Sequence, residues 1–140
     1  CSTVGMNISI GCPKTLMPQK WIVDIALKKA KISGSKTDIT SSPKEAVKDA
    51  DIVYADTWFS YNIPKKLWKN RIKLLKSYQV NKWLMKYAKK DAIFMNCLPA
   101  MRGYEQTAEI IDGKRSIVFD QAENRLHMQK AIILKLLNKI

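Results

Sequence analysis

The chain has 140 residues, of which 46% are hydrophobic and 26% are charged, and its formal net charge is +13. These proportions are typical of a globular protein with its own core and exclude an intrinsically disordered chain. No apolar run reaches the roughly 18 residues of a membrane-spanning helix, and the first residues show neither a basic leader nor a long apolar stretch. We therefore expect one soluble, cytoplasmic domain over residues 1–140, although the initial Cys1 leaves open a segment that precedes it.

The positive charge permits two interpretations. A strongly basic chain can attract nucleic acid or another anionic partner. Here nearly all of the charge comes from lysine, which is poorer than arginine at bidentate recognition of phosphates and bases. The lysines recur at helical spacing, which is typical of solvent-facing helix surface, as in Lys65, Lys66, Lys69, Lys73 and Lys76. We therefore favour exposed helix surface and expect no nucleic-acid partner.

The cysteines and the histidine do not form a recognisable metal or disulfide pattern. Cys1, Cys12 and Cys97 are odd in number and contain no C-x-x-C pair, so we expect reduced thiols. His127 is the only histidine, has no second ligand near it in the sequence, and is interpreted as structural. No glycine-rich nucleotide motif is present. We expect neither a metal nor a cofactor.

Apolar runs with strand character alternate with segments of helical periodicity. This alternation predicts an α/β fold with a doubly wound parallel sheet of about five strands, covered by helices on both faces in a three-layer, Rossmann-like arrangement. The predicted strands are residues 4–10, 36–40, 51–55, 92–96 and 116–119. The two middle runs are almost continuously apolar, which favours strands that are buried on both faces.

Helix boundaries are marked by punctuation residues. Pro18 and Gly34 bracket a helix whose apolar side is Trp21, Ile22, Ile25, Ala26 and Ala30. Asp120, with Glu123 three residues later, predicts a capping box for the last helix. An apolar seam then follows along that helix, at Ala122, Leu126, Ile133, Leu137 and Ile140.

Polar and reactive side chains follow several of the predicted strands. Ligands of parallel α/β sheets bind at the carboxyl ends of the strands, where loops converge. Those ends carry residues 11–14, 56–61, 96–99 and 120–125. One carboxylate, one thiol, several hydroxyl and amide groups and one arginine would therefore share an edge of the sheet.

Each of these side chains also has a simpler interpretation. Cys97 is either a site thiol or a small buried apolar residue, and the pattern does not choose between them. Asp56 could bind a substrate ammonium or cap the next segment. Arg125 lies near the start of its helix, an unfavourable position for a cation unless an anionic partner is close.

Four motifs in order resemble the second half of the ornithine carbamoyltransferases, of the aspartate/ornithine carbamoyltransferase superfamily. They are D-T-W-F-S from Asp56, Y-Q-V-N from Tyr78, M-N-C-L-P-A-M-R-G from Met95 and F-D-Q-A-E-N-R-L-H from Phe119. A complete chain of that family has a carbamoyl phosphate-binding domain followed by an ornithine-binding domain, and three chains form a trimer. The Ser-Thr-Arg-Thr and His-Pro-x-Gln motifs of the first domain are missing here. The chain therefore resembles the ornithine-binding half alone.

The resemblance implies roles for individual residues. Asp56 and Ser60 would hold the amino-acid end of L-ornithine, and Tyr61 lies in the loop that closes over it. Cys97 would lie beside the reacting amine as the catalytic residue, and the backbone at Cys97 and Leu98 would orient the carbamoyl amide. The Leu98-Pro99 bond is cis in the family.

The remaining implications concern carbamoyl phosphate, partners and departures from the pattern. Arg125 would reach carbamoyl phosphate, and the family needs no cofactor. Asn96 stands where the family has histidine, and Tyr61-Asn62 replaces Met-Gly. An asparagine can keep a hydrogen bond but cannot titrate. The alternatives are therefore a non-catalytic binding module, or a carbamoyltransferase for putrescine or another amine.

Overall fold

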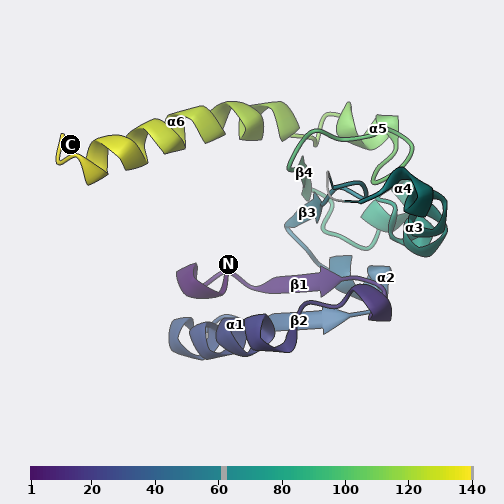
Figure 1. The fold of residues 1–140 in the computed structure, drawn as a ribbon, viewed down its shortest axis with the longest axis horizontal. Coiled ribbons are helices and arrows are strands. Elements are labelled where there is room, and N and C mark those ends of the chain that lie inside the picture. The colour runs from purple at the N-terminus through teal and green to yellow at the C-terminus, as the bar shows by residue number, and fades with distance from the viewer. Residues whose placement is uncertain (61–62, 140) are drawn as a thin grey trace.

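Four short strands form two parallel pairs in the computed structural model, which describes residues 1–60 and 63–139. Strand β1 (Ile8–Gly11) pairs with β2 (Thr37–Thr40), and β3 (Ile52–Ala55) pairs with β4 (Ile93–Asn96). Figure 1 shows the two pairs as separate layers of the molecule. The class is α/β, as predicted.

Helices connect the strands and follow the last of them. They are α1 (Lys20–Ser33), α2 (Pro43–Val47), α3 (Trp68–Leu75), α4 (Lys82–Met85), α5 (Ala108–Ile111) and α6 (Val118–Leu136). Single 3-10 turns lie at η1 (Ser2–Val4), η2 (Lys14–Leu16), η3 (Lys65–Leu67) and η4 (Lys76–Tyr78). Gly34 ends α1 with a φ of 77°, a conformation that suits glycine. In each pair, helical segments connect one strand to its parallel neighbour, as the alternation of strands and helices predicts.

A single five-stranded sheet is not confirmed. Of the residues predicted as a fifth strand, Ser116 makes only an isolated bridge to Phe94, while Val118 and Phe119 already belong to α6. The first strand begins at Ile8, not Val4, because the chain from Ser2 to Val4 forms a 3-10 turn. The apolar run at 116–119 resembles a strand, but helix formation takes over after one bridge.

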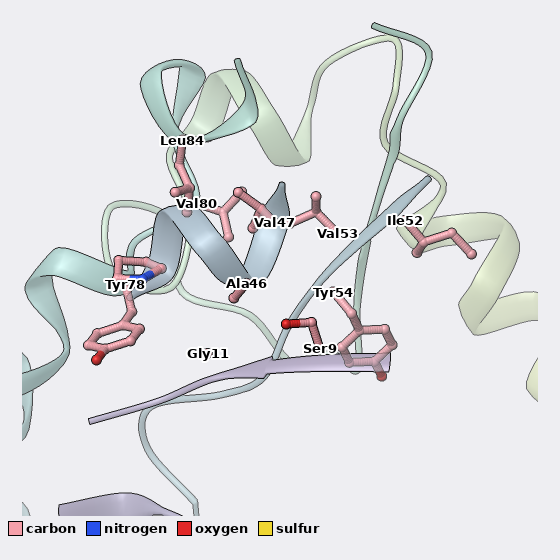
Figure 2. A pocket seen from close by; sticks show the side chains of 11 residues that line it. Ser9, Gly11, Ala46, Val47, Ile52, Val53, Tyr54, Tyr78, Val80 and Leu84 are labelled. Carbon is pink, nitrogen blue, oxygen red and sulfur yellow. The ribbon is translucent and has the colours of Figure 1, made fainter. Parts of the chain in front are cut away.

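A pocket separates the two strand pairs. It is lined by Ser9 and Gly11 of β1, by residues of β3, and by α2, which lies between them (Figure 2). A Cβ built at Gly11 would lie 2.7 Å from the Cβ of Ala46, so only glycine lets α2 approach β1 this closely. Helix α2 thus packs closely on the first strand pair, and the two strand pairs remain separate sheets.

The core lies around β3 and β4. Phe94 and Val118 are fully buried and pack in one cluster with Val53, Leu84 and Ile111. By contrast, Ile52 and Tyr54 on the other side of β3 are 40% and 52% exposed. Coverage by helices on both faces is therefore wrong for β3, whose second face is open among the described residues.

Two helices leave much of their predicted apolar sides exposed. On α1, Ala30 is buried, but Trp21 is 61% exposed. On α6, Leu126, Ile133 and Leu137 are all more than half exposed, and the helix runs away from both strand pairs (Figure 1). The predicted seam residue Ile140 lies outside the described residues. Within residues 1–60 and 63–139, no helix is long and apolar enough to cross a membrane.

The capping box predicted at Asp120 is wrong. Helix α6 begins at Val118 with Ile117 as its N-cap, and no side chain caps that end. Asp120 instead lies in the first turn, where its negative charge interacts favourably with the positive end of the helix dipole.

Candidate functional site

The loops that carry Asp56 and Cys97 meet because β3 and β4 are parallel neighbours. Ala55 lies opposite Asn96 in the register of this pair, so the next residue of each strand emerges at the same edge. The thiol of Cys97 donates a hydrogen bond to Oδ1 of Asp56 at 3.3 Å. Oδ1 also accepts the backbone N–H of Thr57 at 2.8 Å. The predicted convergence of these two strand ends is confirmed.

The environment of Cys97 keeps its thiol protonated. Burial raises the pKa of the thiol, and the hydrogen bond to Asp56 and the negative charge of that carboxylate raise the pKa further. A thiolate, not a thiol, is the reactive nucleophile. Cys97 is therefore arranged as a hydrogen-bond donor beside a carboxylate, not as an activated nucleophile.

Leu98 has an unusual backbone conformation, which is supported by the buried side chain of Asn96. Its φ is 44°, a region that residues other than glycine seldom adopt, and the Leu98-Pro99 bond is cis, which confirms the expectation from the family. Oδ1 of Asn96 accepts the N–H of Leu98 at 2.8 Å, and Nδ2 of Asn96 donates to Gln106. Asn96 is 1% exposed. Its amide therefore faces inward and orients the loop.

Two more buried side chains support the same loops and were missed by the sequence analysis. Glu105 is 1% exposed and accepts hydrogen bonds from the N–H groups of Trp58 and Met101. Gln106 is fully buried, accepts from Asn96 and lies opposite Val80 in an isolated bridge. Neither residue lies at a strand end or in a periodic pattern. Their only signal was an E-Q pair in a short, otherwise polar loop.

Aromatic packing holds the loop between Asp56 and Ser60. Trp58 is 5% exposed and contacts Tyr104 edge to face. Phe59 packs on both Tyr104 and Trp68. Ser60 itself is exposed, and Tyr61 lies outside the described residues. The loop is thus fixed at its middle, between the two side chains predicted to hold ornithine.

Arg125 lies farther along α6. Gln121, one helical turn earlier, accepts the N–H of Asn96 and donates to the hydroxyl of Tyr54. Residues four apart lie on the same side of a helix, so Arg125 lies one turn beyond Gln121 on the side of α6 that contacts β4. Its side chain is exposed, and no hydrogen bond or ion pair among the described residues joins it to Asp56 or Cys97. The structure brings together Asp56, Cys97 and Leu98, but it does not bring Arg125 to them.

Metal ligands do not gather anywhere in the described part of the chain, where no group of three or more histidine, cysteine or acidic side chains could hold an ion. His127 is exposed, and its nearest charged partner is Glu123 of the same helix, at 3.4 Å. The edge formed by β3 and β4 offers instead a carboxylate and a thiol. A carboxylate accepts hydrogen bonds from ammonium and amide N–H groups.

A comparison with protein families agrees with this arrangement. The model for "Aspartate/ornithine carbamoyltransferase, Asp/Orn binding domain" matches residues 1–136. The chain belongs to this family. The motifs that carried the resemblance in the sequence lie within the matched residues, and those at Asp56 and Cys97 form the edge described above.

Similar proteins in the family are longer than this chain. The ornithine carbamoyltransferase of Caldicellulosiruptor saccharolyticus is 53% identical over 95% of the chain and 43% of the relative. The crystal structure of anabolic ornithine carbamoyltransferase from Campylobacter jejuni has a TM-score of 0.90 at 38% identity, covering 98% of this chain and 45% of that one. An N-acetyl-L-ornithine transcarbamylase has a TM-score of 0.82 at 27% identity, covering 96% and 42%. The chain thus spans less than half the length of these family members.

Proposed function

We propose that this chain is the ornithine-binding domain of an ornithine carbamoyltransferase. The whole enzyme transfers the carbamoyl group of carbamoyl phosphate to the side-chain amine of L-ornithine, which gives citrulline and phosphate. The observation that carries the proposal is the contact between Asp56 and Cys97 at the shared end of β3 and β4. The names of the similar proteins support the choice of substrate.

The exposed carboxylate of Asp56 provides the charge that an amino-acid substrate needs. Oδ1 is occupied by Thr57 and Cys97, whereas Oδ2 makes no hydrogen bond among the described residues. Oδ2 is therefore the oxygen that binds the ammonium group at the amino-acid end of ornithine. The hydroxyl of Ser60 and the loop at Tyr61 complete the binding of that end.

The turn at Cys97 and Leu98 orients the reacting groups. Its backbone carbonyls accept hydrogen bonds from the carbamoyl amide, and the protonated thiol lies beside the attacking amine. The uncharged amine forms a bond to the carbamoyl carbon, the bond from that carbon to the phosphate oxygen breaks, and the proton lost by the amine ends on the departing phosphate. Placing both reactants in one geometry lowers the barrier, as does a cation near the departing phosphate. The family resemblance assigns this cation to Arg125, whose exposed side chain makes no ion pair or hydrogen bond with Asp56 or Cys97 among the described residues.

A carbamoyl phosphate-binding domain is the partner that this site requires. The chain spans 43% of the Caldicellulosiruptor saccharolyticus relative, so a relative has room for a second domain of similar size. The exposed apolar residues of α6 form a surface suited to packing against that domain. We place the complete protein in the cytoplasm as a trimer without a cofactor, with no nucleic acid or membrane as partner.

A second candidate function is carbamoyl transfer to a different amine. It rests on the similar fold of an N-acetyl-L-ornithine transcarbamylase and on the replacement of the usual Met-Gly by Tyr61-Asn62. The exposed carboxylate of Asp56 favours a substrate that keeps its free amino-acid ammonium, because acetylation removes that charge. Ornithine therefore remains the first choice.

A chimeric enzyme tests the proposal. The first half of the Caldicellulosiruptor saccharolyticus enzyme is fused to this chain, and citrulline is measured with ornithine and carbamoyl phosphate. We expect citrulline from the chimera and none from the 140-residue chain alone. An assembled chimera without product would overturn the proposal, and turnover by the isolated chain would remove the need for a second domain.

A further inference from the structure

We propose that Glu105 is a positioning residue that fixes the distance between the two loops of the site. The inference rests on the function proposed above. Glu105 lies in neither loop and touches no residue that is expected to contact substrate. It bonds instead to the middle of one loop and to the end of the other.

The first arm of Glu105 holds the loop that carries Asp56 and Ser60. Oε1 accepts the backbone N–H of Trp58 at 2.9 Å and the hydroxyl of Thr57 at 3.4 Å. Trp58 is the midpoint between Asp56 and Ser60, so fixing its peptide fixes the spacing of the two side chains. The carbonyl of Trp58 accepts a separate hydrogen bond from Nε of Arg71 at 2.8 Å, which does not involve Glu105.

The second arm holds the loop that carries Cys97 and Leu98. Oε2 accepts the N–H of Met101 at 3.0 Å, where the chain leaves the turn around Pro99. The carboxylate of Glu105 thus accepts hydrogen bonds from both loops, through different oxygens. We call this arrangement the clamp. Displacement of either loop along its hydrogen bond would break that bond, and for the first loop it would leave the buried N–H of Trp58 without a partner.

The backbone of Glu105 is itself anchored to the core. The N–H of Val80 donates to its carbonyl at 2.8 Å, and the N–H of Thr107 donates back to Val80 at 3.0 Å. Val80 belongs to the core cluster. Nε2 of Gln79 binds the carbonyls of Gly103 and Tyr104, which fixes the turn before Glu105. The clamp is therefore attached to a fixed point, not to another loop.

The chemistry requires a carboxylate at this position. A carboxylate has two acceptor oxygens and no donor, whereas glutamine has one acceptor oxygen and an NH₂ group. In Glu105→Gln, one of the two N–H partners would face another donor, although the side chain keeps its size. The glutamine variant therefore removes one arm without opening a cavity.

Hydrogen exchange of the 140-residue chain tests the clamp without any substrate. We expect Glu105→Gln to speed exchange at the amides of Trp58 or Met101 by about tenfold or more, because a charge-assisted hydrogen bond is lost. Amides of β3 and β4 should keep their rates. Glu109→Gln is the matched control, since Glu109 pairs with Lys82 at the surface and touches neither loop. Unchanged exchange at both amides, or equal acceleration throughout β3 and β4, would overturn the clamp.

Kinetics of the chimeric enzyme test what the clamp does. We expect Glu105→Gln to raise the KM for ornithine by about tenfold and to lower kcat, because both loops lose their spacing. Partial unfolding alone would lower the apparent kcat and leave KM unchanged. An active chimera whose KM is unaffected by Glu105→Gln would contradict the positioning role. Absence of citrulline from the unsubstituted chimera would instead count against the proposed function, and the exchange result would still decide the clamp.

Discussion

The side-chain oxygen of Asn96 lies 2.8 Å from the backbone nitrogen of Leu98 and accepts its hydrogen bond. This bond supports a leucine with a φ of 44° at the turn that carries Cys97. Asn96 occupies the position of the family's histidine, yet it is fully buried and faces Gln106, away from the exposed edge. We infer that asparagine preserves the shape of the turn without contributing a titrating group.

Removal of this amide should destabilise the chain. Asn96→Ala leaves the N–H of Leu98 without its acceptor and Oε1 of Gln106 without its donor, which should cost about 2 kcal/mol of unfolding free energy. Urea denaturation measures the loss. Asn124→Ala, at an exposed position of α6, is the control and should change stability little. Equal stability of both variants would show that the bond to Leu98 contributes nothing.

Cys97 should react slowly with alkylating agents. Burial and the hydrogen bond to Asp56 raise its pKa, so only a small fraction is thiolate at neutral pH. We expect iodoacetamide to modify the exposed Cys1 first, and Asp56→Asn to speed modification of Cys97. Peptide mass spectrometry after timed alkylation measures both rates. Faster labelling of Cys97 than of Cys1 at pH 7 would contradict the protonated thiol.

The same pKa shift has a consequence for stability. The folded pKa of Cys97 lies above the unfolded one, so the folded state binds the thiol proton more tightly. The resulting stabilisation is fully present below the unfolded pKa and is lost as pH rises through the folded pKa. Cys97→Ser should therefore show less loss of unfolding free energy than the unsubstituted chain between neutral and alkaline pH. An identical pH dependence of the two proteins would exclude a contribution from this thiol.

The close approach of α2 to β1 at Gly11 can be tested with a matched pair of substitutions. Gly11→Ala places a methyl group 2.7 Å from the Cβ of Ala46 and should cost roughly 1–3 kcal/mol. Ala46→Gly removes the opposing methyl group, so the double variant should recover part of the loss despite the helix penalty of glycine. Thermal unfolding of all four proteins completes the cycle. Simple additivity of the two losses would show that the contact with Ala46 is not the cause.

Asp56 should matter for binding more than for folding. Asp56→Asn keeps the oxygen that accepts from Thr57 but removes the negative charge that the substrate ammonium requires. In the chimeric enzyme, we expect the KM for ornithine to rise by about tenfold or more. Asp51→Asn, which removes a surface partner of Lys89 at the amino end of β3, opposite to the end that carries Asp56, is the control. An unchanged KM in Asp56→Asn would exclude Asp56 as the ammonium partner.

Much of the central fold could be predicted because short apolar runs mark β3 and β4 within a residue of their observed starts. Their parallel pairing places Asp56 beside Cys97, so the meeting of these two residues followed from the strand ends, whereas their roles came from the family resemblance. The apolar run at 116–119 was mistaken for a strand, since a pattern of four residues does not distinguish a strand from the first turn of α6. The exposure of the apolar sides of α1 and α6 could not be predicted, because periodicity shows that a helix has an apolar side but not what covers it.

The support of the site could not be predicted from the sequence. Glu105 and Gln106 act through contacts that span up to 48 residues, and nothing in their own neighbourhood indicates burial. A glutamate in a polar loop is normally exposed. Only the folded chain shows that this carboxylate lies between two loops that the sequence had already marked for function.

Substrate preference of the chimeric enzyme decides whether this chain is an ornithine-binding domain. The rate of carbamoylation is measured with L-ornithine, N-acetyl-L-ornithine and putrescine at equal carbamoyl phosphate, and the three values of kcat/KM are compared. We expect the highest value for L-ornithine, and a loss of that preference in Asp56→Asn. A higher kcat/KM for N-acetyl-L-ornithine or putrescine, or no carbamoylation of any amine by an assembled chimera, would contradict it.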